Sequence, residues 1–104
     1  MKVKINDTEV ELRFTFDAFI EYEKKWGESL GVSNDLAKTI SFEYFTVLCS
    51  KKGWQSDNWL SYEDFTEWMN DDPYRYVEIS EFIGKYMNME NVLTKKEADA
   101  EKKS

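Results

Sequence analysis

The chain has 104 residues, which is enough for one domain of common size. Its 21 acidic residues outnumber 14 basic ones, and a net charge of −7 repels phosphate, so we expect neither a nucleic-acid nor an anionic-membrane partner. The absence of histidine and the single cysteine exclude the commonest general base, a Cys-rich zinc site and an internal disulfide. No apolar run approaches the roughly 20 residues that span a bilayer, and the first residues lack a signal-peptide core, so we expect a cytoplasmic protein.

Residues 2–14 predict a β-hairpin. Apolar and charged side chains alternate on both sides of Asn6-Asp7, a pair that tolerates the positive φ of a tight two-residue turn. Lysines on the first strand would face glutamates on the second strand at the exposed surface. Because a lone hairpin is only marginally stable in water, we expect its apolar face to pack on helices.

Helices are predicted at about residues 16–26, 35–52, 62–70 and 73–87. Thr15 can cap the first helix and Gly27 is placed to end it. The side chains expected on the apolar side of the first helix are Phe16, Phe19, Ile20, Tyr22 and Trp26. Those expected to face inward from the second are Leu36, Ile40, Tyr44, Val47 and Leu48. Ser41 could begin a new helix, so residues 35–52 form one helix or two with a bend.

Gly53 is the expected end of the second helix, and residues 54–60 are predicted to form an aromatic loop. Ser61 to Asp64 has the form of a capping box, and Asp72-Pro73 is typical of a helix start. The predicted fold is α+β and mainly α, an N-terminal β-hairpin packed on a bundle of about four to five helices. Residues 1–93 would form a single globular domain, and residues 94–104 a charged flexible tail.

The sequence offers little chemistry for catalysis. Cys49 stands in an apolar helix and is expected to be an inert core thiol. The carboxylates fall mostly on predicted polar helix faces, and no phosphate-binding loop or calcium loop is present. We therefore expect no enzymatic activity, no cofactor and no metal.

The negative charge is concentrated in residues 54–83, which contain eight acidic residues and one basic residue, Arg75. This segment is either the solvated outer face of two helices or a docking face for a basic partner. Trp54 and Trp59 are open to two interpretations as well, since they either fill the end of the bundle or form an exposed anchor for a partner. Arg75 is expected to pair with a neighbouring acid.

The hairpin over residues 3–12, followed by the aromatic-rich helix that ends at Gly27, resembles the tail assembly chaperones of long-tailed (siphovirus-type) bacteriophages and related prophages. A middle helix ending in a glycine such as Gly53 is similar to that family too. So is an aromatic loop followed by a Ser-x-x-acid helix, as in Trp54 to Trp68. The resemblance covers about residues 1–88 and contains no catalytic signature.

The resemblance implies a non-enzymatic helper of the host bacterial cytoplasm that is absent from the mature virion. It would bind the tape-measure protein and keep it soluble while tail-tube subunits polymerise, with the tail-tube protein as a second candidate partner. Some members have a longer form made by ribosomal frameshifting, and residues 94–104 are where such an extension would join. The oligomeric state stays open. We predict partner-binding anchors and a charged rim at Trp54, Trp59, Trp68, Glu63, Glu67, Asp71 and Asp72.

Two other functions are compatible with the sequence. The first is an acidic inhibitor that mimics DNA and binds a DNA-binding host protein through the acidic residues of 54–83. The second is a structural or adaptor protein of the virion. Salt dependence separates mimicry from apolar binding, because mimicry would weaken steeply with added salt.

Overall fold

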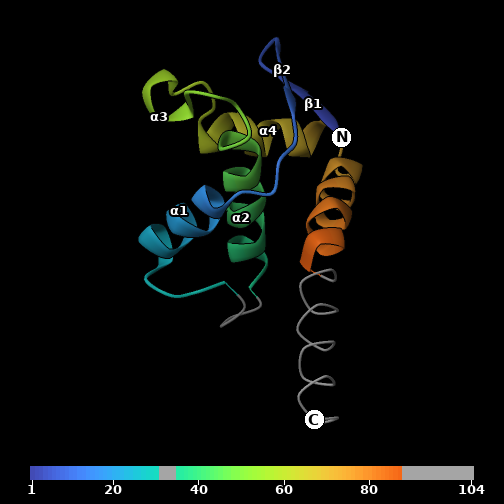
Figure 1. The fold of residues 1–104 in the computed structure, drawn as a ribbon. Helices are drawn as coiled ribbons and strands as arrows, with labels where there is room; N and C mark the ends of the chain where they lie inside the picture. The colour runs from blue at the N-terminus through green and yellow to red at the C-terminus, as the bar shows by residue number, and fades with distance from the viewer. Residues whose placement is uncertain (31–34, 88–104) are drawn as a thin grey trace, which may run out of the picture.

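The computed structural model describes residues 1–30 and 35–87 (Figure 1). As predicted, the fold is α+β and mainly α. The described residues contain a two-stranded antiparallel hairpin and five helices, joined by turns and loops. The elements are β1 (Lys2–Ile5), β2 (Thr8–Glu11), α1 (Phe16–Trp26), α2 (Leu36–Leu48), α3 (Trp54–Asp57), α4 (Tyr62–Asp71) and a fifth helix over residues 74–87. The predicted tail at 94–104 lies outside the described residues.

The hairpin has the predicted register and turn. Lys2 lies opposite Glu11 and Lys4 opposite Glu9, so opposite charges meet on the exposed face. The turn residues Asn6 and Asp7 have φ angles of 52° and 62°, which is the left-handed backbone that a tight two-residue turn requires. The Asn6 side-chain amide also donates a hydrogen bond of 3.0 Å to the carboxylate of Asp64, which ties the hairpin tip to α4.

The ends of α1 follow the predicted chemistry. The Thr15 hydroxyl accepts a hydrogen bond of 3.4 Å from the backbone N–H of Ala18, and Gly27 ends the helix with a φ of 70°. The inward side of α1 is narrower than predicted. Ala18 and Tyr22 are buried against α2, whereas Phe16 is 87% exposed.

Ile20, which lies one turn after Phe16, is 47% exposed, so the expectation that both side chains face the core is wrong. The physical reason is that α2 covers only one flank of α1, as Figure 1 shows. Phe16 is also the first residue of its helix. Helical side chains lean toward the N-terminus, so Phe16 extends beyond the helix instead of lying over a preceding turn.

The central helix α2 is continuous through Ser41, whose hydroxyl accepts a hydrogen bond of 3.1 Å from the Trp26 indole. It ends at Leu48, four residues before the predicted end at 52. The last carbonyls of a helix lack donors within the helix, and the backbone carbonyl of Leu48 accepts a hydrogen bond of 3.1 Å from the indole of Trp59, which stabilises this end. Leu36, expected to face inward, is 62% exposed at the other end of α2.

The region predicted as an aromatic loop contains the short helix α3. The helix α4 starts as predicted, since the Ser61 hydroxyl accepts a hydrogen bond of 3.1 Å from the backbone N–H of Asp64. The Asp72 carboxylate accepts a hydrogen bond of 3.2 Å from the N–H of Tyr74, which fixes the start of the fifth helix. None of the helices in the described residues has both the length and the apolar character needed to cross a membrane.

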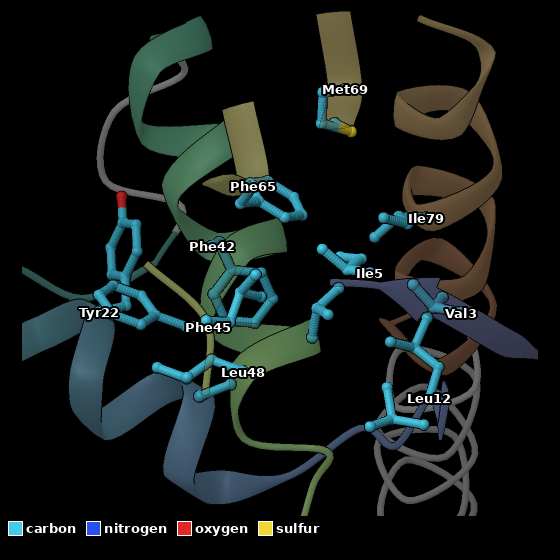
Figure 2. Packing of buried hydrophobic residues seen from close by; sticks show 14 residues of the cluster. Val3, Ile5, Leu12, Tyr22, Phe42, Phe45, Leu48, Phe65, Met69 and Ile79 are labelled. Atoms are coloured by element: carbon cyan, nitrogen blue, oxygen red, sulfur yellow. The ribbon is translucent and has the colours of Figure 1, made fainter. Parts of the chain in front are cut away.

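The core lies where α2, α4, the hairpin and the fifth helix meet. Figure 2 shows Phe42 and Phe45 from α2 packed with Phe65 from α4, while Ile5 from β1 and Ile79 from the fifth helix complete the cluster. Four residues of the hairpin segment are buried in it: Val3, Ile5, Val10 and Leu12. The hairpin therefore packs on helices, as its marginal stability in isolation requires.

Candidate functional site

The three tryptophans proposed as anchors are each half-buried and pack against the core. The indole of Trp59 caps the end of α2 through the carbonyl of Leu48. The guanidinium of Arg75 lies 4.5 Å from the ring centre of Trp68 and donates a hydrogen bond of 2.6 Å to the Trp68 carbonyl. The prediction that Arg75 pairs with an acid is therefore wrong, because it contacts Trp68 instead. Partner binding by these tryptophans stays a prediction.

The predicted acidic rim is exposed to solvent. Glu63, Glu67 and Asp71 recur every four residues and share one face of α4, and Asp72 follows at its end. The structure divides some of the predicted residues between at least two hollows. Trp54 lines one hollow, whereas Trp68 and Asp72 line another of about 240 Å³ beside the first residues of the hairpin. Trp54 and Trp68 thus line different hollows in the part of the chain that the structure describes.

The hollow that contains Trp54 is the main candidate site. It has a volume of about 520 Å³, within the range of ligand-binding clefts. One wall is the connection from β2 into α1, residues 13–17, and the other is the turn from α2 into α3, residues 49–55. We call it the Phe16 groove, after its most exposed apolar side chain.

A buried hydroxyl holds the two walls of the Phe16 groove together. The Ser50 hydroxyl accepts a hydrogen bond of 2.8 Å from the backbone N–H of Arg13 and donates one of 2.6 Å to the carbonyl of Thr46 in α2. Ser50 is buried, so this link is shielded from water. It fixes the start of the first wall against the last turn of α2.

Aromatic contacts fix the next residue of the same wall. The ring of Phe14 stacks on Tyr86 of the fifth helix, with ring centres 5.2 Å apart and planes 6° apart. The same ring meets the edge of Phe19 in α1 at 5.4 Å. Phe14 is therefore held on two sides, and Phe16, two residues later, begins α1 with its side chain in solvent.

The second wall depends on a tight turn and an ion pair. Gly53 has a φ of 77°, a backbone conformation that a residue with a side chain adopts only with strain. The ammonium of Lys51 pairs with the carboxylate of Asp57, which spans α3 from the turn to its last residue. Trp54 is thereby placed at the groove with one side packed on the core.

The groove has apolar and charged groups but no nucleophile that is ready to react. Burial raises the pKa of the Cys49 thiol to about 12, so the reactive thiolate is scarce at neutral pH. This agrees with the predicted inert core thiol. Among residues 1–30 and 35–87, no cluster of His, Cys, Asp or Glu side chains is arranged to hold a metal ion.

A buried carboxyl group that was not expected from the sequence lies outside the groove. Glu43 of α2 is fully buried, and one of its oxygens accepts a hydrogen bond of 3.2 Å from the Ser80 hydroxyl of the fifth helix. Its other oxygen has no hydrogen-bond partner among the described residues. Burial raises the pKa of Glu43 to about 8, an effect that the Ser80 hydrogen bond partly opposes. No periodicity signalled this, because Glu43 lies in a helix that is buried almost all round.

Comparison with protein-family models, with curated proteins and with solved structures found no match to this chain.

Proposed function

We propose that this protein is a tail assembly chaperone of a long-tailed bacteriophage or prophage. It binds the tape-measure protein without chemical conversion and keeps it soluble while the tail tube assembles. The proposal combines the resemblance of residues 1–88 to that family with the Phe16 groove. The finished virion would not contain the chain, and its place of action would be the host cytoplasm.

The exposure of Phe16 is the observation that carries the proposal. Its ring is 87% exposed although the neighbouring residues of the wall are fixed by hydrogen bonds and ring contacts. Covering one such side chain contributes about 1.5–3 kcal/mol to an association. Ile20, on the same face of α1, adds a second apolar contact. A long helical partner with an apolar stripe would cover Phe16 and Ile20 together. Many copies of this chain could bind along such a partner, so that the partner is covered although each contact is weak.

DNA mimicry is the alternative that the acidic face of α4 permits. Glu63, Glu67 and Asp71 follow one another at about 6 Å along the axis of α4, because four residues of a helix rise by that distance. Mimicry would bind through such charges and weaken steeply with added salt, whereas apolar binding at Phe16 would hardly change.

The test is co-expression with the tape-measure protein encoded in the same genome. Wild-type chain is expected to move the tape-measure protein into the soluble fraction. The Phe16→Ser variant should lose most of this effect, because it removes the exposed ring. Tyr74→Ser is the matched control, since Tyr74 is an exposed aromatic of the fifth helix outside the groove. Equal solubility of the tape-measure protein with and without the wild-type chain would exclude the proposal.

A further inference from the structure

The Phe16 groove is locally basic in an otherwise acidic protein. Three basic side chains line it, Arg13, Lys51 and Lys52, against one acidic side chain, Asp17. The three basic residues also line a neighbouring hollow of about 400 Å³ together with Val10 of β2. The basic groups therefore form a ridge between two hollows. The negative charge of the chain is concentrated in residues 54–83, whereas the walls of this groove, residues 13–17 and 49–55, have a local excess of positive charge.

Two of these three cations are available to a ligand. Lys51 is engaged with Asp57. Arg13 and Lys52 are both exposed, and neither forms an ion pair within residues 1–30 and 35–87. The hydrogen bond to Ser50 fixes the backbone of Arg13, and Arg13 lines the same wall of the groove as the exposed Phe16.

The occupant must match an apolar surface next to positive charge. The rings of Phe16 and Trp54 offer apolar contact, and the cations offer ionic contact on the same walls. We infer that the groove receives an acidic amphipathic segment of a partner protein, with apolar side chains on Phe16 and Trp54 and carboxylates on Arg13 and Lys52. This inference rests on the proposed function, because it takes the groove to be the place where the larger protein is held.

The surrounding charge selects against a polyanion such as nucleic acid. Asp17 lines the groove itself, and Glu9 and Glu11 line the neighbouring hollow. A continuous row of phosphates would lie against these carboxylates as well as against the cations. A segment with separated carboxylates can place them on the two free cations alone. The groove therefore fits a protein segment better than a nucleic acid.

Synthetic helical peptides test the inference. The probe has leucine at helical spacings of three and four, two glutamates beside the leucine stripe, and alanine or glutamine at its other positions. Two matched peptides carry glutamine or lysine in place of the two glutamates. Isothermal titration calorimetry gives the affinities, and the Trp54 indole N–H signal in NMR spectra reports the site. We expect the acidic peptide to bind about 3- to 10-fold more tightly than the glutamine peptide, a preference that added salt reduces.

The double variant Arg13→Gln/Lys52→Gln should abolish the preference and leave binding of the glutamine peptide unchanged. Lys4→Gln/Lys24→Gln is the matched control, because it removes the same charge from exposed positions outside the groove and should keep the preference. Equal affinity for the three peptides, or a preference that survives the Arg13 and Lys52 changes, would overturn the inference. So would failure of the acidic peptide to bind while the chain self-associates through these cations, since the occupant would then be a second copy.

The same double variant in the co-expression experiment separates this inference from the proposed function. If the double variant keeps the tape-measure protein as soluble as the wild-type chain does, and Phe16→Ser does not, the chaperone function is supported. The inference that the groove binds an acidic segment is then overturned. If the wild-type chain does not make the tape-measure protein more soluble, the proposed chaperone function is excluded, whatever the peptides bind.

Discussion

The buried carboxyl of Glu43 predicts that stability falls as pH rises through the neutral range. Glu43 is shielded from water between α2 and the fifth helix, and one of its oxygens has no partner among the described residues. Its pKa is about 8 in the folded chain against an ordinary value of 4.5. The folded state therefore keeps a proton that the unfolded state releases between these two values.

The size of the effect follows from the difference between the two pKa values. Each unit is worth about 1.36 kcal/mol, so the free energy of unfolding should fall by up to about 5 kcal/mol between pH 4.5 and pH 8 because of Glu43. Below pH 4.5 both states are protonated, and above pH 8 both are ionised, so the contribution is flat outside the window. A change of this size is a large part of the 5–15 kcal/mol that typically stabilises a domain.

Glu43→Gln provides the comparison, because glutamine keeps the shape of the protonated acid and can still accept the Ser80 hydrogen bond. Urea unfolding followed by tryptophan fluorescence at pH 5, 6, 7, 8 and 9 gives the free energy of unfolding of both proteins. The difference between them should grow with pH in favour of Glu43→Gln and level off above pH 8. Parallel profiles, or a wild-type chain that gains stability relative to the variant as pH rises, would show that the Glu43 carboxyl does not keep its proton in the folded chain.

Four further predictions follow from single side chains. Trp59→Phe should lower the free energy of unfolding by about 1 kcal/mol, seen in urea unfolding, because the carbonyl of Leu48 loses its donor; an unchanged midpoint would contradict this role. Asp7→Gly should stabilise the chain by about 0.5–1 kcal/mol at its φ of 62°, and a lower thermal midpoint would argue against the tight turn. Cys49 should react with a thiol reagent only as fast as the chain opens, so fast labelling under native conditions would show that it is accessible. Phe16→Ser should leave the thermal midpoint within a few degrees of wild type while weakening partner binding, whereas a collapsed midpoint would assign the ring to the core.

Local chemistry explains why much of the fold could be predicted. Asn6 and Asp7 form the turn, Thr15 and Gly27 bound α1, and Ser61 starts α4, because each acts on backbone atoms a few residues away. Each of these features depends on residues that are close in the sequence. Each could therefore be predicted without knowing which elements pack across the core.

Tertiary packing explains what could not be predicted. Phe16 is exposed because α2 covers only the other flank of α1, and α2 ends at Leu48, whose carbonyl is satisfied by the indole of Trp59 from beyond the helix. The burial of Glu43 depends on the fifth helix. The candidate site follows the same rule. Trp54 was singled out as a candidate because it lies in a predicted loop. Arg13 and Lys52 could not be predicted as site residues, because they are far apart in the sequence and line one groove only after folding brings its two walls together.

We propose that this chain holds a tape-measure protein by contact and leaves before the particle is complete. Quantitative mass spectrometry of assembly intermediates and finished particles, purified after prophage induction, distinguishes this role from a structural one. Intermediates that lack a complete tail are expected to contain several copies of the chain for each tape-measure protein, and finished particles none. A constant number of copies in finished virions, or intermediates that hold the tape-measure protein without this chain, would contradict it.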